Sequence, residues 1–360
     1  MKLFACPHCS QVVFFENVVC ERCNHALGYE PTSDSMLALE KSDDGAWRSV
    51  GQNSDGASWL YCSNYAFGVC NWLTPASGGE QMCACCRHNL VVPDTSDAAN
   101  VELWRKMEVA KRRLFYTLIK LGLPLQTRAE HPEGLGFQFL SDSPETGDHV
   151  MTGHDDGLIT IALVEADDAE REKRRTSMGE PYRTLLGHFR HEVGHWYWDR
   201  LVRDGGALDQ CRQTFGDDSQ DYGEALKAHY ANGPKPGWQN EFVSHYAASH
   251  AWEDFAETWA HYLHITDTLD TAGAWGFRVN PKVDREDVLT AKVNFDAYGK
   301  ETPMEQIADS WLALSSALNS LNRSMGAPDP YPFVLAEPVI QKLGFVHDLV
   351  HGRVGTATAH

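Results

Sequence analysis

The chain has 360 residues, and 42% of them are hydrophobic, which is enough for a packed core and excludes global disorder. Its 50 acidic residues outnumber its 31 Lys and Arg, and the resulting net charge of −19 argues against a nucleic-acid partner. Its apolar stretches are far shorter than the ~20 residues that cross a bilayer, and its first 20 residues do not resemble a secretory signal, so we expect a cytoplasmic protein without a membrane partner.

The first cysteines form a regular pattern. Two C-x2-C pairs separated by ten residues open the sequence, and their members are Cys6, Cys9, Cys20 and Cys23. In a reducing compartment, clustered cysteines more often bind metal than form disulfides. Each pair is expected to form a knuckle, and the four thiolates together would hold one tetrahedral zinc ion. The interval over residues 12–19 predicts a short hairpin that turns at Glu16-Asn17.

A second cysteine set follows, with Cys62, Cys70, Cys83 and Cys86. Only Cys83 and Cys86 have the C-x2-C spacing, whereas Cys62 and Cys70 form a looser pair. We expect a second structural zinc ion here, with Cys85 left over; the alternative is a single ribbon with stray thiols. Bound zinc would supply much of the folding energy of this region, and zinc ribbons also serve as docking modules for protein partners.

A polar, turn-forming segment at residues 94–100 predicts a boundary between a zinc-ribbon region at 1–93 and a second domain at 94–360. Leucine and aromatic residues at helical spacing then predict a helix over 101–121. Two short apolar runs, 136–140 and 157–163, are expected to be strands.

The segment 182–202 contains an H-E-x-x-H motif, His191-Glu-Val-Gly-His195. On a helix, histidines four residues apart lie on one face and can bind a single zinc ion. Glu192 would then lie beside the metal as a general base. Because the motif also arises by chance, the interpretation requires a third ligand.

Two schemes for that ligand fit poorly. The H-E-x-x-H-x-x-G-x-x-H pattern fails because Trp198 and Leu201 stand where its glycine and histidine should be. The segment 216–223 resembles the aspzincin box, but Ser219 occupies the position of that family's aspartate ligand.

A third scheme places a glutamate ligand on a later helix. Glu253 and Glu257 are four residues apart and therefore share one helix face, while Phe255, Trp259 and Tyr262 share the other. Glu253 would complete a site of two histidines and one glutamate, with the fourth position open to water. Glu257 is expected to accept a hydrogen bond from a ligand histidine and so fix its tautomer.

Three segments together resemble the gluzincin metallopeptidases and are similar to the lethal-factor and Mlc-titration-factor group: His191-Glu-Val-Gly-His195, Phe242-Val-Ser-His-Tyr246 and Glu253-Asp-Phe-Ala-Glu257. In that group a tyrosine seven residues before the glutamate ligand polarises the scissile carbonyl, and the resemblance implies this role for Tyr246. Over nearly its full length, the chain resembles a bacterial family of zinc-binding metallopeptidases with an N-terminal zinc-ribbon region. The resemblance implies the chemistry without naming a substrate.

The sequence therefore predicts a zinc-dependent peptidase that acts on a peptide or protein, with one catalytic and two structural zinc ions. Zinc held by His191, His195 and Glu253 would activate a water molecule, and Glu192 would move its proton. Strand 157–163 is expected to pair with an extended substrate at a sheet edge. Two alternatives stay open: a catalytically silent binding module whose ribbons recruit a partner, and a zinc hydrolase of a non-peptide amide.

The expected fold class is α+β, with a mostly helical zincin-like domain and a small sheet that follow the ribbon region. Amphipathic patterns predict two late helices, over 303–321 and 338–349. The segment 204–240 is rich in Gly, Asp and Pro, and its composition predicts a loop that covers the cleft.

Overall fold

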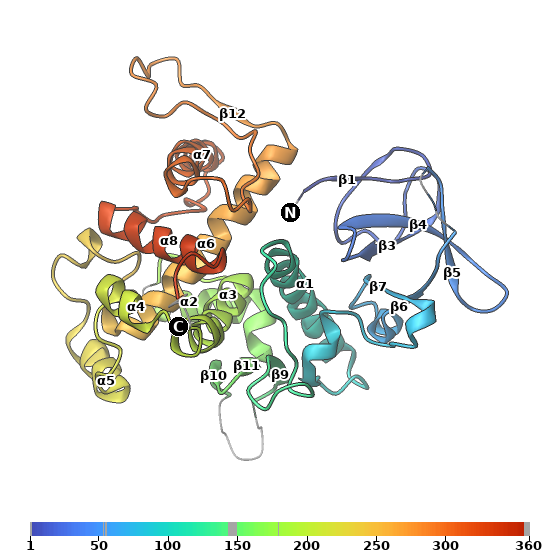
Figure 1. Cartoon of the computed structure of the whole chain (residues 1–360), viewed down its shortest axis with the longest axis horizontal. Coiled ribbons are helices and arrows are strands. Elements are labelled where there is room, and N and C mark those ends of the chain that lie inside the picture. Colours follow the sequence, from blue (N-terminus) through green and yellow to red (C-terminus); the bar gives the residue numbers. More distant parts are fainter. Residues whose placement is uncertain (1, 53, 55, 143–149, 179, 356–360) are drawn as a thin grey trace, which may run out of the picture. The chain divides into compact units, whose positions relative to one another are not determined.

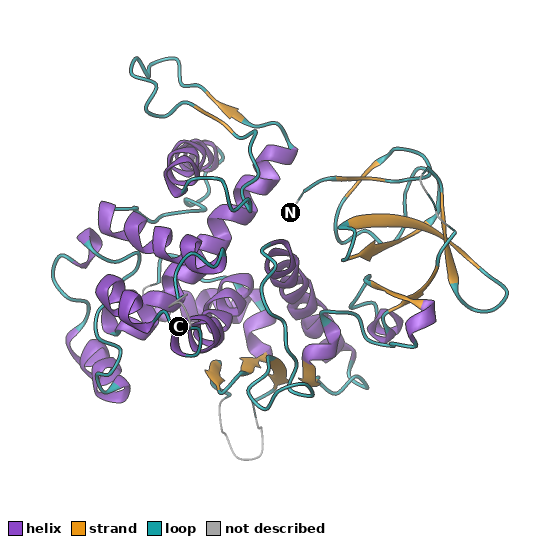
Figure 2. Ribbon diagram, in the orientation of Figure 1, coloured by secondary structure: helices purple, strands orange, loops and turns teal. Residues whose placement is uncertain are grey.

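The computed structural model describes residues 2–52, 54, 56–142, 150–178 and 180–355. They divide into two compact units, with the division between Arg171 and Glu172. Most strands lie in the first unit and most helices in the second, so the fold is α+β (Figure 2). The helix predicted over 101–121 and the small sheet therefore pack in the same unit as the ribbons. The domain boundary at residues 93 and 94 stays a prediction.

Each cysteine knuckle of the first ribbon lies between two short paired segments. β1 (Phe4–Ala5) pairs with β2 (Val12–Val13), and Val19 forms a bridge with Ala26. The hairpin predicted over 12–19 is therefore wrong, because its two halves pair across the knuckles and not with each other. A knuckle is itself a tight turn, so it folds the chain back onto the residues just before it.

The rest of the ribbon region is a five-stranded antiparallel sheet. Its strands, in spatial order, are β3 (Ala26–Glu30), β4 (Ser35–Lys41), β5 (Trp47–Val50), β6 (Ser58–Tyr61) and β7 (Leu73–Pro75). A bridge between Tyr29 and Trp72 joins β3 to the residues just before β7, so the sheet curls on itself. Both side chains are buried and contact Phe15 in an aromatic core. This region thus has an apolar core in addition to its cysteine sites.

The first unit also contains α1 (Ala98–Lys120) and a four-stranded sheet. The strand order is β10 (Gly153–Asp155), β11 (Leu158–Ala162), β9 (Gly136–Leu140) and β8 (Asn89–Val91). The strands predicted at 136–140 and 157–163 are both present. However, β11 pairs with β10 on one side and with β9 on the other. The prediction that strand 157–163 offers a free edge to a substrate is therefore wrong.

The second unit is a helical assembly around one long helix, α6 (Ala251–Ala274) (Figure 1). The helices that pack against α6 include α3 (Leu185–Tyr197), α4 (Leu208–Phe215), α7 (Met304–Ser324) and α8 (Glu337–Val350). After α3 the chain continues as a π-helical segment, Trp198–Arg203, and two short strands, β12 (Arg278–Val279) and β13 (Ala291–Lys292), pair before α7. Both late helices occur where the sequence predicts them. Among the described residues, no helix combines the length and apolar character that a membrane span requires.

The segment 204–240 is mainly helical, so its prediction as a loop is wrong. It contains α4 and α5 (Tyr222–Asn232). The Asp221 side chain caps α5 by accepting a hydrogen bond from the Glu224 backbone, and glycines follow the last residues of both helices. Asp and Gly serve here as helix caps, and this is why the composition resembled that of a loop.

Candidate metal centre

The motif histidines lie on α3 and the predicted glutamate ligand lies on α6, so the close crossing of these helices builds the site. Gly194 lies at the crossing point. A Cβ atom on this residue would lie 3.1 Å from Cα of Ala256 and 3.2 Å from the ring of Trp259. Glycine therefore allows an approach that a larger residue would prevent.

Gly194→Ala tests this packing. An alanine gains up to about 1 kcal/mol in a helix interior, but overpacking against fixed backbone costs about 1–3 kcal/mol. We therefore expect a lower free energy of unfolding, measured by urea denaturation. The control is Gly344→Ala in α8, where the nearest atom to the new Cβ would be 3.9 Å away, so the variant should gain stability. A Gly194→Ala protein as stable as the wild type would contradict the close-crossing argument.

Three ligand atoms converge where the helices cross. His191 Nε2 lies 3.2 Å from His195 Nε2 and 3.0 Å from Glu253 Oε2, and the third separation, from His195 Nε2 to Glu253 Oε2, is 3.6 Å. A tetrahedral zinc ion with bonds of about 2.0–2.1 Å places its ligand atoms roughly 3.3–3.4 Å apart. The spacing of this group fits such an ion.

The hydrogen bonds of the group also fit a cation. His191 Nδ1 is 2.8 Å from Glu257 Oε1 and donates its proton to this carboxylate, so Nε2 presents a lone pair to the other ligand atoms. Glu253 is 1% exposed, and its Oε2 atom faces the two histidines. A buried carboxylate that faces imidazole lone pairs is a donor set suited to zinc.

Glu257 is held in place from its other side. The Ser244 hydroxyl donates to Glu257 Oε2 at 2.7 Å and itself accepts the backbone N–H of Ala247 at 3.0 Å. Burial would raise the pKa of Glu257, but the effects of His191, His261 and Ser244 together outweigh it and lower the pKa to about 2. The charged carboxylate therefore fixes both the tautomer and the ring orientation of His191.

Glu192 and Tyr246 lie beside this group. Glu192 is 9% exposed, and burial raises the pKa of its carboxyl group against the opposing effect of the two histidines. The Tyr246 ring lies 5.9 Å from the His191 ring, measured between centroids. Burial also raises the pKa of the Tyr246 hydroxyl, which therefore stays protonated and able to donate a hydrogen bond.

Tyr222 is a residue of the site that the sequence reasoning missed. Its hydroxyl donates to Glu253 Oε1 at 2.6 Å. It lies in the segment 216–223, in which Ser219 stands at the position of the aspzincin aspartate ligand. The tyrosine of that segment is the signal that the sequence offers for this residue. Its role becomes clear only from its contact with Glu253 on α6.

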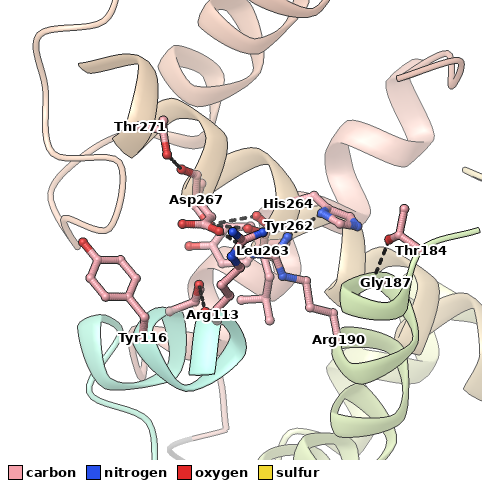
Figure 3. A network of polar contacts seen from close by, with 12 residues as sticks. Arg113, Tyr116, Thr184, Gly187, Arg190, Tyr262, Leu263, His264, Asp267 and Thr271 are labelled. Carbon is pink, nitrogen blue, oxygen red and sulfur yellow. Dashed lines mark hydrogen bonds and ion pairs between the residues drawn. The ribbon is translucent and has the colours of Figure 1, made fainter. Parts of the chain in front are cut away.

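A buried ion pair ties α3 to α6 next to the site. Arg190, which precedes the first histidine and is 2% exposed, donates to Asp267 Oδ2 at 2.6 Å and contacts His264 Nδ1 (Figure 3). The Tyr298 hydroxyl donates to the other Asp267 oxygen at 3.1 Å. Because each charged group has a partner, this network fixes how far α3 is rotated and shifted along α6.

The structure also brings together both predicted cysteine sets. Each set of four has all its sulfur atoms within 4.8 Å of one another, and Cys85 belongs to neither set. The sulfur atoms of Cys9 and Cys20 lie 3.5 Å apart, and those of Cys70 and Cys83 lie 3.8 Å apart. A tetrahedral zinc ion with Zn–S bonds of about 2.3 Å requires sulfur atoms roughly 3.8 Å apart. Both sets have the spacing of a structural zinc site.

Known families match both halves of this arrangement. Residues 100–349 match the family described as "Putative zinc-binding metallo-peptidase", and residues 3–97 match a zinc-ribbon domain. The chain therefore belongs to this metallo-peptidase family and carries a zinc-ribbon domain at its N-terminus. It is 42% identical over 354 residues to proteins of Mycobacterium bovis and Mycobacterium tuberculosis, each described as uncharacterized, and the match covers 97% of this chain and 95% of theirs. No solved structure matches the chain.

Proposed function

We propose that the protein is a zinc-dependent metallopeptidase of the gluzincin type, with His191, His195 and Glu253 as the ligands of a catalytic zinc ion. The observation that carries this proposal is the convergence of the three ligand atoms, at separations of 3.0–3.6 Å, next to a buried glutamate. A purely structural contact between α3 and α6 would not require three metal-ligating atoms to face one another, nor Glu192 beside them.

Each protein group then has a chemical task. Zinc bound to the three ligands would lower the pKa of a water molecule and polarise a substrate carbonyl. Glu192 accepts the proton of the attacking water and returns it to the leaving amine. Tyr246 donates a hydrogen bond to the carbonyl oxygen as negative charge develops there. Glu257 keeps His191 oriented throughout.

We assign peptides or proteins as the substrate class and the cytoplasm as the compartment. All ten cysteines are free of disulfide bonds, which agrees with a reducing environment. The two four-cysteine sites are assigned one structural zinc ion each, and the ribbon surface is available to a protein partner.

The experiment that tests this function is a cleavage screen with the zinc-loaded protein on a library of proteome-derived peptides, with products identified by mass spectrometry. We expect cleavage that a hydroxamate inhibits. Tight hydroxamate binding without cleavage of any peptide would favour a hydrolase of non-peptide amides. If the protein neither cleaves a peptide nor binds the hydroxamate, a catalytically silent binding module is favoured.

Tyr246→Phe tests the tyrosine separately. Loss of a hydrogen-bond donor to the developing oxyanion costs about 10²–10³ in kcat, because that bond is strongest in the transition state. We expect this loss with zinc content and KM nearly unchanged, measured by steady-state kinetics on a cleaved peptide. An unchanged kcat would make Tyr246 an ordinary packing residue.

A further inference from the structure

The two oxygen atoms of Glu253 have different neighbours. Oε2 faces both motif histidines, at 3.0 and 3.6 Å, whereas Oε1 accepts the hydroxyl of Tyr222 at 2.6 Å. A carboxylate can bind a metal through one oxygen or through both. The phenol of Tyr222 already hydrogen-bonds to the oxygen that a second bond would need.

The ring of Tyr222 is held on two sides. It meets the ring of Trp252 edge-on at 5.4 Å and the ring of His250 edge-on at 5.5 Å, both measured between centroids. The hydroxyl groups of Tyr222 and Tyr246 lie near enough for each to affect the pKa of the other. The ring contacts show that the position of Tyr222 does not depend on the Glu253 contact alone.

Tyr222 reaches the site because it is the first residue of α5. This helix contributes no residue to the buried core, and it is flanked by Gly216 and Gly233, whose φ angles are +98° and +73°. Two turns after Tyr222, the ring of His229 lies parallel to the ring of His245 at a centroid distance of 5.6 Å. Side chains at both ends of α5 therefore dock this exposed helix beside the metal centre.

We propose that Tyr222 is a positioning residue of the metal centre, which holds Glu253 as a one-oxygen ligand. A catalytic zinc site needs an open position for water or substrate, and a glutamate bound through both oxygens would fill it. By occupying Oε1, Tyr222 keeps that position free and aims Oε2 at the metal. This inference rests on the proposed function, because it concerns the same three ligands.

The test is Tyr222→Phe, which removes the hydroxyl and keeps the ring between Trp252 and His250. Loss of a hydrogen bond that orients a ligand typically weakens metal affinity about 10–100-fold. We expect that loss at the catalytic site, measured by zinc competition with a chelator on the full chain. We also expect the visible spectrum of Co²⁺ bound at this site to change toward a higher coordination number, which a merely structural role would not produce.

Tyr230→Phe is the matched control, since Tyr230 is on the same helix and 68% exposed. It should leave both the affinity and the spectrum unchanged. A Tyr222→Phe protein with wild-type zinc affinity and an unchanged Co²⁺ spectrum would overturn this inference alone. If wild type and Glu253→Ala hold the same amount of zinc, the proposed function fails as well, because there is then no metal for Tyr222 to position.

Discussion

Glu192→Gln is expected to abolish peptide cleavage while the zinc content stays at the wild-type level. The amide is nearly the same size as the carboxylate but cannot accept the proton of the attacking water. General-base catalysis contributes about 10²–10⁴-fold, so kcat/KM should fall by at least this amount. The measurement is steady-state cleavage of a peptide found in the screen, with metal content and thermal stability determined on the same preparation.

Glu257→Gln is the informative comparison, because it changes a second, half-buried glutamate of the site by the same amide substitution. It weakens the orientation of His191, so its activity should recover when zinc is added in excess, whereas Glu192→Gln should stay inactive at any zinc concentration. Undiminished turnover by Glu192→Gln would remove this residue from the mechanism.

Glu253→Ala is expected to lower the zinc content from about three ions per chain to about two, since it removes one of three ligands of the catalytic site and none from the cysteine sites. The measurement is metal content by mass spectrometry on protein purified without chelators. Cys83→Ser should also lower the count to about two, but with a loss of stability that Glu253→Ala does not share. A wild-type content of about two that Glu253→Ala leaves unchanged would mean that the H-E-x-x-H helix binds no zinc.

The residues that the sequence grouped correctly are those whose geometry is local. His191 and His195 share a helix face because they are four residues apart, and a C-x2-C pair forms a knuckle wherever it occurs. The same reasoning placed Glu257 one turn from Glu253. The structure adds that both helices cross closely enough for these groups to meet, which depends on Gly194.

What the sequence could not reveal depends on tertiary contacts. The composition of residues 12–19 favours strands, but each end of this segment pairs with residues on the far side of a cysteine knuckle. The composition of strand 157–163 suits an edge strand and an interior strand of a sheet equally well. Only its pairing with a strand on each side shows that it is an interior strand. Asp221 and the glycines near α5 looked like loop residues because helix caps and loops use the same amino acids. Tyr222 was missed because only its contact with Glu253, on a distant helix, places it in the site.

The crossing of α3 and α6 has a consequence for how the protein would respond to zinc shortage. Packing around Gly194 and the buried pair of Arg190 and Asp267 fix this crossing without help from a metal. Removal of the catalytic ion would therefore leave the second unit folded, and activity would return when zinc is restored. The knuckle of Cys6 and Cys9 joins two strands of only two residues each, so the ion of the first cysteine site is coupled to folding itself. We therefore expect loss of zinc from the site of His191, His195 and Glu253 to be reversible, and loss of zinc from the first cysteine site to unfold the chain around it.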